Sequence, residues 1–234
     1  MRSIALMSDT LSDTSTMSST NKFVPALVVI DMQNDFVTGS LAVPGGADII
    51  DNINTLVDLP FTLKIATRDL HPEKHVSFAE THGKAVFSTK TIYHPEDEDR
   101  TFGLEQVLWP VHCVTGTSGC DFVPGLNTEP FQKVVLKGVD PGVESYSAFQ
   151  DIWAKNATEL PEILRANQVT DVYFVGLAGD FCVKFSAIDA LKLGYRTWLV
   201  EDAVKSIKDQ GVVFEELQRM GIRVTTTDEV AKVF

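Results

Sequence analysis

One cysteine of this 234-residue chain stands where a strand is expected to turn into a helix. Residues 172–175 form an apolar run typical of a short buried strand, two glycines follow, and apolar residues at helical spacing resume after Cys182. A thiol at such a turn lies among free backbone N–H groups and beside the positive end of a helix dipole. Both features favour the thiolate, and the same N–H groups can receive an oxyanion. Cys182 is therefore a candidate nucleophile, with a small buried thiol that only packs as the alternative.

Two charged residues stand at the predicted ends of other strands. Asp31 follows the β-branched run 26–30, and Lys137 ends the run 133–137. Open α/β sheets place their ligands at the carboxyl ends of their strands. A carboxylate there can act as a base, and a lysine adds a fixed positive charge. Taken alone, Asp31 could instead cap nearby N–H groups, and Lys137 could extend along the surface into water.

A third group of residues has the chemistry of a metal site. Asp69 and His71 follow the predicted strand 61–67, and the proline after His71 favours an extended backbone that points both side chains to the same side. All five histidines lie between His71 and His112. One carboxylate and two imidazoles suit zinc, iron or manganese. Solvated turn residues are the alternative for such a short pattern.

The elements that must position these residues alternate between strand and helix. Strands are predicted over residues 26–30, 61–67, 133–137, 171–175, 195–200 and 222–224, and helices over 48–57, 159–167, 182–193 and 209–220. This order predicts an α/β fold with a doubly wound, mostly parallel sheet of about six strands and helices on both faces, Rossmann-like in outline. Such a sheet brings the ends of its strands to one rim.

The remaining segments are predicted to be irregular. Residues 1–22 are rich in Ser and Thr and read as a disordered leader before a single domain over 23–234. Between about 83 and 107 the periodicity is lost, which predicts a long surface insertion, with a lid as one interpretation.

Composition narrows the classes of function. The chain has 44% hydrophobic residues, enough for a full core, and its net charge of −12 argues against a nucleic-acid or anionic-membrane surface. Its three cysteines form no disulfide framework, and no apolar run is long enough to span a membrane. Cys113, Cys120 and His112 lack a fourth ligand for a structural zinc site. A cytoplasmic protein is expected.

Asp31, Lys137 and Cys182 together resemble the Asp-Lys-Cys triad of the isochorismatase-like cysteine hydrolases. The resemblance covers roughly residues 25–233. Its motifs are residues 29–36 (VIDMQNDF), 136–138 (LKG) and 176–183 (GLAGDFCV). It implies the fold predicted above, a cis peptide bond between Leu177 and Ala178, and an oxyanion hole made by the N–H groups of Ala178 and Cys182.

Within this family, residues 67–75 (TRDLHPEKH) and 109–113 (WPVHC) are similar to the metal-binding motifs of nicotinamidases. The resemblance implies one divalent metal ion, Zn²⁺ first and Fe or Mn as alternatives. The implied ligands are Asp69, His71 and His112, with Glu80 as a further acidic contact. The implied aromatic lining of the substrate pocket is Phe36, Trp109 and Tyr146. The stretch 83–107 resembles the longer, eukaryotic members.

The activity implied is hydrolysis of nicotinamide to nicotinate and ammonia through a cysteine thioester in NAD salvage, with pyrazinamide also accepted. Three alternatives stay open: a cysteine amidase of the same family acting on another small amide, a zinc-hydroxide amidase in which Cys182 is structural, and a non-catalytic sensor. The α/β surface permits a homo-oligomer without demanding one.

Overall fold

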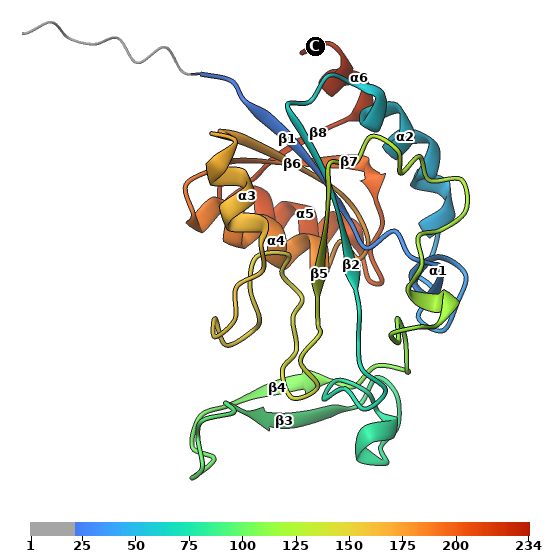
Figure 1. Ribbon diagram of the computed structural model, residues 1–234, viewed down its shortest axis with the longest axis vertical. Helices are drawn as coiled ribbons and strands as arrows, with labels where there is room; N and C mark the ends of the chain where they lie inside the picture. Colours follow the sequence, from blue (N-terminus) through green and yellow to red (C-terminus); the bar gives the residue numbers. More distant parts are fainter. Residues whose placement is uncertain (1–21) are drawn as a thin grey trace, which may run out of the picture.

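The computed structural model describes residues 22–234 around a central twisted sheet (Figure 1). The sheet has six strands in the order β5-β2-β1-β6-β7-β8, and all its neighbouring pairs are parallel. Its strands are β1 Pro25–Ile30, β2 Leu63–Asp69, β5 Lys133–Lys137, β6 Asp171–Gly176, β7 Arg196–Val204 and β8 Arg223–Thr225. The predicted fold class is confirmed. The predicted leader, residues 1–22, lies outside the described residues except for Lys22.

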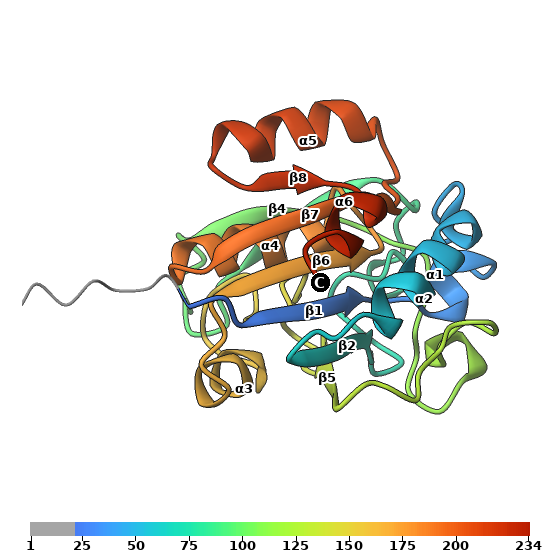
Figure 2. The same ribbon diagram turned by 90° about the horizontal axis from the view of Figure 1, so that it is seen from above.

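Helices cover both faces of the sheet, as the doubly wound pattern requires (Figure 2). One face packs against α2 Ile50–Asp58 and α6 Thr227–Ala231, and the other against α3 Leu160–Ala166, α4 Cys182–Lys192 and α5 Gln210–Arg219. A single turn, α1 Asn34–Val37, follows β1. Within residues 22–234, none of these helices has the length and apolar character needed to cross a bilayer.

β1 shows why the sheet is buried on both sides. Its side chains alternate between the two cores: Leu27 and Val29 pack toward α2, while Ala26, Val28 and Ile30 pack toward α4. A strand with two apolar faces must lie in the interior of a covered sheet, because neither face can meet water at low cost. This accounts for the unbroken apolar run in the sequence.

The order of the strands creates a crevice beside β1. From β1 the chain adds β2 and β5 on one side, then returns to add β6, β7 and β8 on the other. The connections after β1 and β6 therefore leave in different directions, which opens a crevice at their carboxyl ends. Ile30 pairs with Gly176 at the end of these strands. Asp31 and the turn leading to Cys182 consequently lie on the two sides of one crevice.

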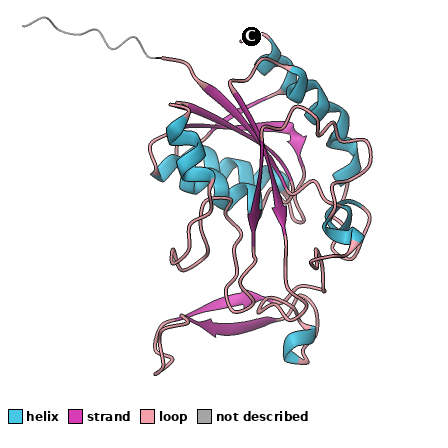
Figure 3. Cartoon of the chain, in the orientation of Figure 1, coloured by secondary structure: helices cyan, strands magenta, loops and turns pink. Residues whose placement is uncertain are grey.

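The prediction that residues 83–107 are irregular is wrong in one respect. Residues 83–107 contain an antiparallel hairpin, β3 Thr89–Tyr93 and β4 Gly103–Val107, where only irregular chain was expected. Hydrophobic periodicity does not mark the hairpin because only Ile92 and Gln106 among its strand residues are buried. The hairpin lies beyond the carboxyl ends of β2 and β5 (Figures 1 and 3). Its origin as an insertion stays a prediction.

Helix α6 was not predicted, although its signal is readable. Thr226 caps the helix by accepting from the backbone N–H of Glu229, and Glu229 accepts in return from the N–H of Thr226. A threonine followed three residues later by glutamate is the capping-box pattern. The helix escapes a search for periodicity because it has only five residues.

Candidate active site

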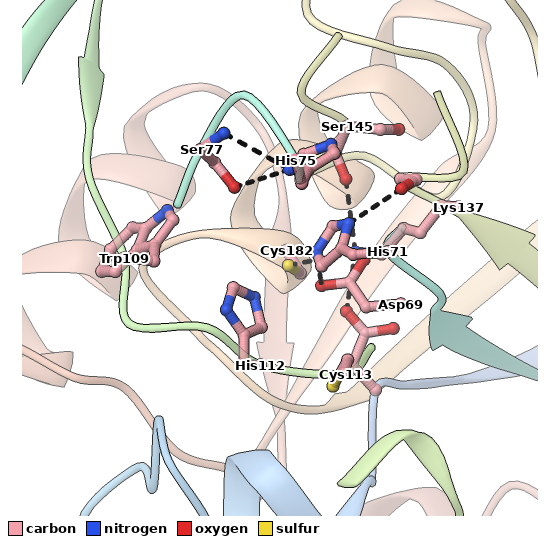
Figure 4. Close-up of polar contacts among 12 residues, drawn as sticks. Asp69, His71, His75, Ser77, Trp109, His112, Cys113, Lys137, Ser145 and Cys182 are labelled. Carbon is pink, nitrogen blue, oxygen red and sulfur yellow. Dashed lines mark hydrogen bonds and ion pairs between the residues drawn. The ribbon is translucent and has the colours of Figure 1, made fainter. Parts of the chain in front are cut away.

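The carboxyl ends of the strands bring four predicted site residues together, and Figure 4 shows three of them, Asp69, Lys137 and Cys182. Asp31 follows β1, Asp69 and Lys137 end β2 and β5, and Cys182 begins α4 after β6. The register of the sheet pairs Asp69 directly with Lys137. Residues more than a hundred positions apart in the chain thus meet through strand pairing alone.

Lys137 connects the other members of this group. Its Nζ lies 2.9 Å from Asp31 Oδ2 and 2.5 Å from Asp69 Oδ1, and it donates a hydrogen bond to Cys182 Sγ at 3.3 Å. The residue is only 2% exposed. Burial disfavours the ammonium, but the two carboxylates outweigh it and raise the pKa of Lys137 well above its usual value. The lysine is therefore a permanent cation within a buried site.

Asp31 is placed as a base toward the thiol. It is fully buried, and its Oδ1 accepts a hydrogen bond of 2.6 Å from the Thr67 hydroxyl. Its Oδ2 faces the Lys137 ammonium at 2.9 Å. A carboxylate oxygen of Asp31 lies within 4.8 Å of Cys182 Sγ. Burial raises the pKa of Asp31, against the opposing pull of Lys137, so the carboxyl is a stronger base than in water.

Burial opposes the effect that the turn was expected to have on the Cys182 thiol. Burial raises the pKa of this thiol well above its usual value, and Lys137 offsets only part of that effect. The side chain is 6% exposed, so little water reaches the sulfur. The resting nucleophile is a thiol, and its proton has to pass to a neighbouring base when the sulfur attacks.

The turn before α4 has the features expected of an oxyanion hole. The peptide bond between Leu177 and Ala178 is cis. Among the described residues, no acceptor is found for the backbone N–H of Ala178 or of Cys182. Cys182 is also the first residue of an 11-residue helix, where backbone N–H groups have no partner within the helix. Two donors are consequently available beside the sulfur.

Asp69, His71 and His112 form a group that fits a metal ion. One ligand atom from each residue lies within 4.8 Å of the others, and all three side chains are buried. Nδ1 of His71 bonds the carbonyl of Gly138, and Nδ1 of His112 bonds that of Pro110, both at 2.8 Å. Since a carbonyl only accepts, each Nδ1 carries a proton, and in the neutral ring each Nε2 has a lone pair for a ligand.

The pKa shifts of Asp69 and His112 favour the forms that bind metal, whereas that of His71 opposes it while no cation is bound. Despite burial, Lys137 and His71 hold the pKa of Asp69 well below its usual range. Burial and the neighbouring His71 lower the pKa of His112 to about 4, whereas Asp69 raises the pKa of His71 against the effect of burial. An ionised carboxylate and a neutral imidazole are the forms that bind metal.

A second possible ligand group shares His71. His71, His75 and Glu144 also bring their ligand atoms within 4.8 Å of one another. In this group both ring nitrogens of His75 are already engaged, by the Ser77 hydroxyl at 2.8 Å and the Val143 carbonyl at 3.1 Å. The first group is therefore the better metal site.

Glu80 is not brought to either ligand group. It lies in a short 3-10 turn, Glu80–His82, and is exposed. Glu144, which sequence analysis missed, is the buried acidic residue near the histidines. The available signal was its position two residues before Tyr146, in the stretch after β5.

A pocket opens onto these residues. It is lined by Phe36, Leu41, Asp69, Trp109, His112, Glu144, Tyr146, Ala178, Phe181, Cys182 and Ile207. All three aromatic residues expected to line the pocket do so. Leu41, Phe181 and Ile207 were missed, because each comes from a connection whose path the sequence does not define.

Three aromatic residues form one wall of the cavity. Phe181 meets Trp109 edge to face with ring centroids 4.8 Å apart, and Tyr146 at 5.4 Å. The Tyr146 hydroxyl accepts a hydrogen bond of 3.1 Å from Trp109 Nε1. These contacts hold the wall in place and give the pocket an aromatic face.

Comparisons with known proteins agree with this site. Residues 25–229 match the model of the isochorismatase domain. The nicotinamidase of Saccharomyces cerevisiae is 39% identical over 211 residues, which are 85% of this chain and 97% of that protein. The crystal structure of the yeast enzyme bound to the inhibitor nicotinaldehyde gives a TM-score of 0.82 at 38% identity, covering 86% of this chain and 99% of the other. The crystal structure of the pyrazinamidase of Pyrococcus horikoshii in complex with zinc gives a TM-score of 0.69 at 36% identity. The match covers 87% of this chain and 99% of that chain. The chain belongs to the isochorismatase family.

Proposed function

We propose that this chain is a nicotinamidase that hydrolyses nicotinamide to nicotinate and ammonia and also accepts pyrazinamide. The observation that carries the proposal is the lining of one cavity. It combines the Cys182 thiol, two side chains of the Asp69–His71–His112 group, and an aromatic wall. The thiol supplies amide chemistry, and the aromatic wall suits a small ring. The similarity to the yeast nicotinamidase supports the same substrate.

The first chemical step is attack of Cys182 Sγ on the carboxamide carbon. Since the resting thiol is protonated, its proton moves to Asp31 as the carbon–sulfur bond forms. The positive charge of Lys137 stabilises the resulting negative charge on the site. The N–H groups of Ala178 and Cys182 receive the oxyanion, and each such donor is worth about 3–4 kcal/mol in comparable sites.

The second half of the reaction releases both products. Asp31 returns the proton to the departing nitrogen, ammonia leaves, and an acyl thioester remains on Cys182. Asp31 then takes a proton from a water molecule as that water attacks the thioester. Collapse breaks the carbon–sulfur bond, and Asp31 returns its proton to the sulfur. The product leaves as nicotinate after its carboxyl proton passes to water, so the site ends as it began.

Asp69, His71 and His112 would hold a divalent cation, which we propose to be Zn²⁺. When bound, it supplies a Lewis acid at the cavity, suited to the lone pair of a pyridine nitrogen or of a water molecule. The zinc complex of the pyrazinamidase from Pyrococcus horikoshii supports this choice. Phe36, Trp109 and Tyr146 line the same cavity, where they would clamp the substrate ring and exclude solvent.

Other predictions from the sequence stay predictions: a single domain over residues 23–234, a cytoplasmic location, a role in NAD salvage, and assembly into a homo-oligomer.

The proposal is tested by incubating the purified chain with nicotinamide and measuring ammonia and nicotinate, before and after treatment with iodoacetamide. Pyrazinamide, benzamide and N-carbamoyl compounds complete the substrate panel. We expect both products from nicotinamide and loss of turnover when Cys182 is alkylated. Turnover of N-carbamoyl compounds alone would overturn the substrate. Turnover that survives alkylation of Cys182 but stops on chelation would assign catalysis to the metal instead.

A further inference from the structure

Gln106 is a buried polar residue in an otherwise exposed hairpin. The strand β4 exposes most of its side chains, but Gln106 is only 3% exposed. A glutamine amide is costly to bury unless its hydrogen bonds are made. Its contacts therefore indicate what the hairpin does for the rest of the molecule.

The Gln106 amide donates toward two residues that line the cavity. Its Nε2 lies 2.7 Å from both the Tyr146 hydroxyl and the Val107 carbonyl, which use its two N–H groups, and a longer, shared contact of 3.3 Å reaches Glu144 Oε2. The carbonyl defines the orientation of the amide, because only the NH₂ group can face it favourably. Gln106 does not itself line the cavity, so it acts on bound molecules through Tyr146 and Glu144.

These contacts also determine the hydrogen-bonding role of Tyr146. Its hydroxyl oxygen accepts from Gln106 and from Trp109 Nε1, which occupies both of its lone pairs. Among residues 22–234, no acceptor is found for the hydroxyl proton. Tyr146 is thus held as a hydrogen-bond donor at the wall of the cavity.

The tip of the hairpin supports the same part of the chain. The rings of His94 and Phe102 each lie 5.4 Å from the Trp153 ring, and Glu96 pairs with Lys155 at 3.0 Å. Trp153 and Lys155 belong to the long connection between β5 and α3, which also carries Glu144 and Tyr146. The hairpin therefore contacts this connection both at its tip and at Gln106, near the end of β4.

We propose that Gln106 is a positioning residue for substrate binding: it holds Tyr146 as a donor and Glu144 at the cavity wall, so the hairpin sets the affinity for the ring-bearing amide. This inference rests on the proposed nicotinamidase activity. Tyr146 and Glu144 come from a different segment than the reacting groups at the strand ends. Loss of the contact should consequently weaken binding of substrate and transition state alike, which raises KM and leaves kcat nearly unchanged.

The test compares Gln106→Leu with Glu105→Leu, a matched change at the adjacent, exposed position of β4. We expect Gln106→Leu to raise KM for nicotinamide about tenfold with kcat within about threefold, as loss of a hydrogen bond from a buried amide predicts. Glu105→Leu should leave both constants within about twofold. In a Tyr146→Phe background, Gln106→Leu should add less than about a threefold further effect, because the contact is already broken.

Either an unchanged KM or a fall in kcat alone in Gln106→Leu would overturn the inference. So would a double variant, Gln106→Leu with Tyr146→Phe, in which KM rises by the product of the two single effects. If Gln106→Leu does not fold, Gln106→Glu keeps the size of the side chain and places a carboxylate beside Glu144, so KM should rise at least as far. A crystal structure of the folded variant gives an answer without turnover, since Tyr146 and Glu144 should move. If the wild-type chain does not act on nicotinamide, the proposed function fails, and unmoved side chains would separately overturn the role of Gln106.

Discussion

The rim of the sheet and the wall of the cavity are built in different ways. At the rim, Asp31, Asp69 and Lys137 lie at the ends of parallel strands, and strand register alone pairs Asp69 with Lys137. At the wall, Gln106 comes from a mostly exposed hairpin, and Tyr146 from a connection without regular structure. The backbone of the sheet holds the rim in place. The wall is held by side-chain contacts between the β3–β4 hairpin and the connection from β5 to α3.

This difference separates the chemistry from the recognition of the ring. The groups that form and break bonds are joined by Lys137, whereas Trp109 and Gln106 both donate to the Tyr146 hydroxyl. Changes at the rim should therefore act mainly on kcat, and changes at the wall mainly on KM.

The largest effect is expected for Cys182→Ala, which removes the nucleophile from the rim. Turnover of nicotinamide should fall about ten-thousandfold or more, as for other covalent nucleophiles. Thermal unfolding should change little, because only a sulfur atom is lost. Cys120→Ala, another buried free cysteine, is the control and should keep full activity. Residual turnover near the wild-type rate would remove Cys182 from the mechanism.

Lys137→Met should have the second largest effect, because it removes the cation that joins the rim. Two buried carboxylates lose their partner, which costs about 3–5 kcal/mol of unfolding free energy. Since Lys137 opposes the effect of burial on Cys182, the pKa of the thiol should rise further. The rate of alkylation by iodoacetamide should then increase only at higher pH than in the wild type.

The control for this change is Lys133→Met, at the exposed start of the same strand. It should leave the pH profile of alkylation and the melting temperature as they are. An identical profile in Lys137→Met and wild type would mean that Lys137 has no electrostatic effect on the thiol.

His112→Ala tests which residues hold the metal ion. His112 lines the cavity from the loop after Trp109 and belongs to the Asp69–His71–His112 group. Bound metal, measured by mass spectrometry of the purified protein, should be lost in His112→Ala. It should be retained in His75→Ala, since both ring nitrogens of His75 already have hydrogen-bond partners. The reverse pattern would place the ion among His71, His75 and Glu144.

The sequence predicted the sheet and the rim for one physical reason. Buried parallel strands need apolar runs, and the carboxyl ends of those strands must meet, so Asp31, Lys137 and Cys182 could be placed together before any coordinates. Asp69 and His71 could be placed for the same reason. The state of the Cys182 thiol could not, because its pKa depends on how completely the folded chain buries it.

The wall could be predicted only through family resemblance. Tyr146 and Trp109 were expected from matching motifs, but the contact of Tyr146 with Gln106 depends on the paths of the hairpin and of the connection after β5. The hairpin carries no hydrophobic pattern because water covers most of it, with Ile92 and Gln106 as the buried exceptions. The exposure of Glu80 could not be predicted for a related reason: the position of an acidic residue along the chain does not define the direction in which its turn faces.

Trp109→Phe should have the smallest effect, and it probes the wall alone. The ring remains as an apolar surface, but the indole N–H no longer donates to Tyr146. Because Gln106 still donates to the same hydroxyl, KM for nicotinamide should rise only about two- to fivefold, less than in Gln106→Leu, with kcat unchanged. Trp198→Phe is the matched control: this indole stacks on Tyr173 at 5.3 Å, away from the cavity, and KM should stay at its wild-type value. A fall in kcat for Trp109→Phe would show that wall and rim are coupled, and the separation drawn above would not hold.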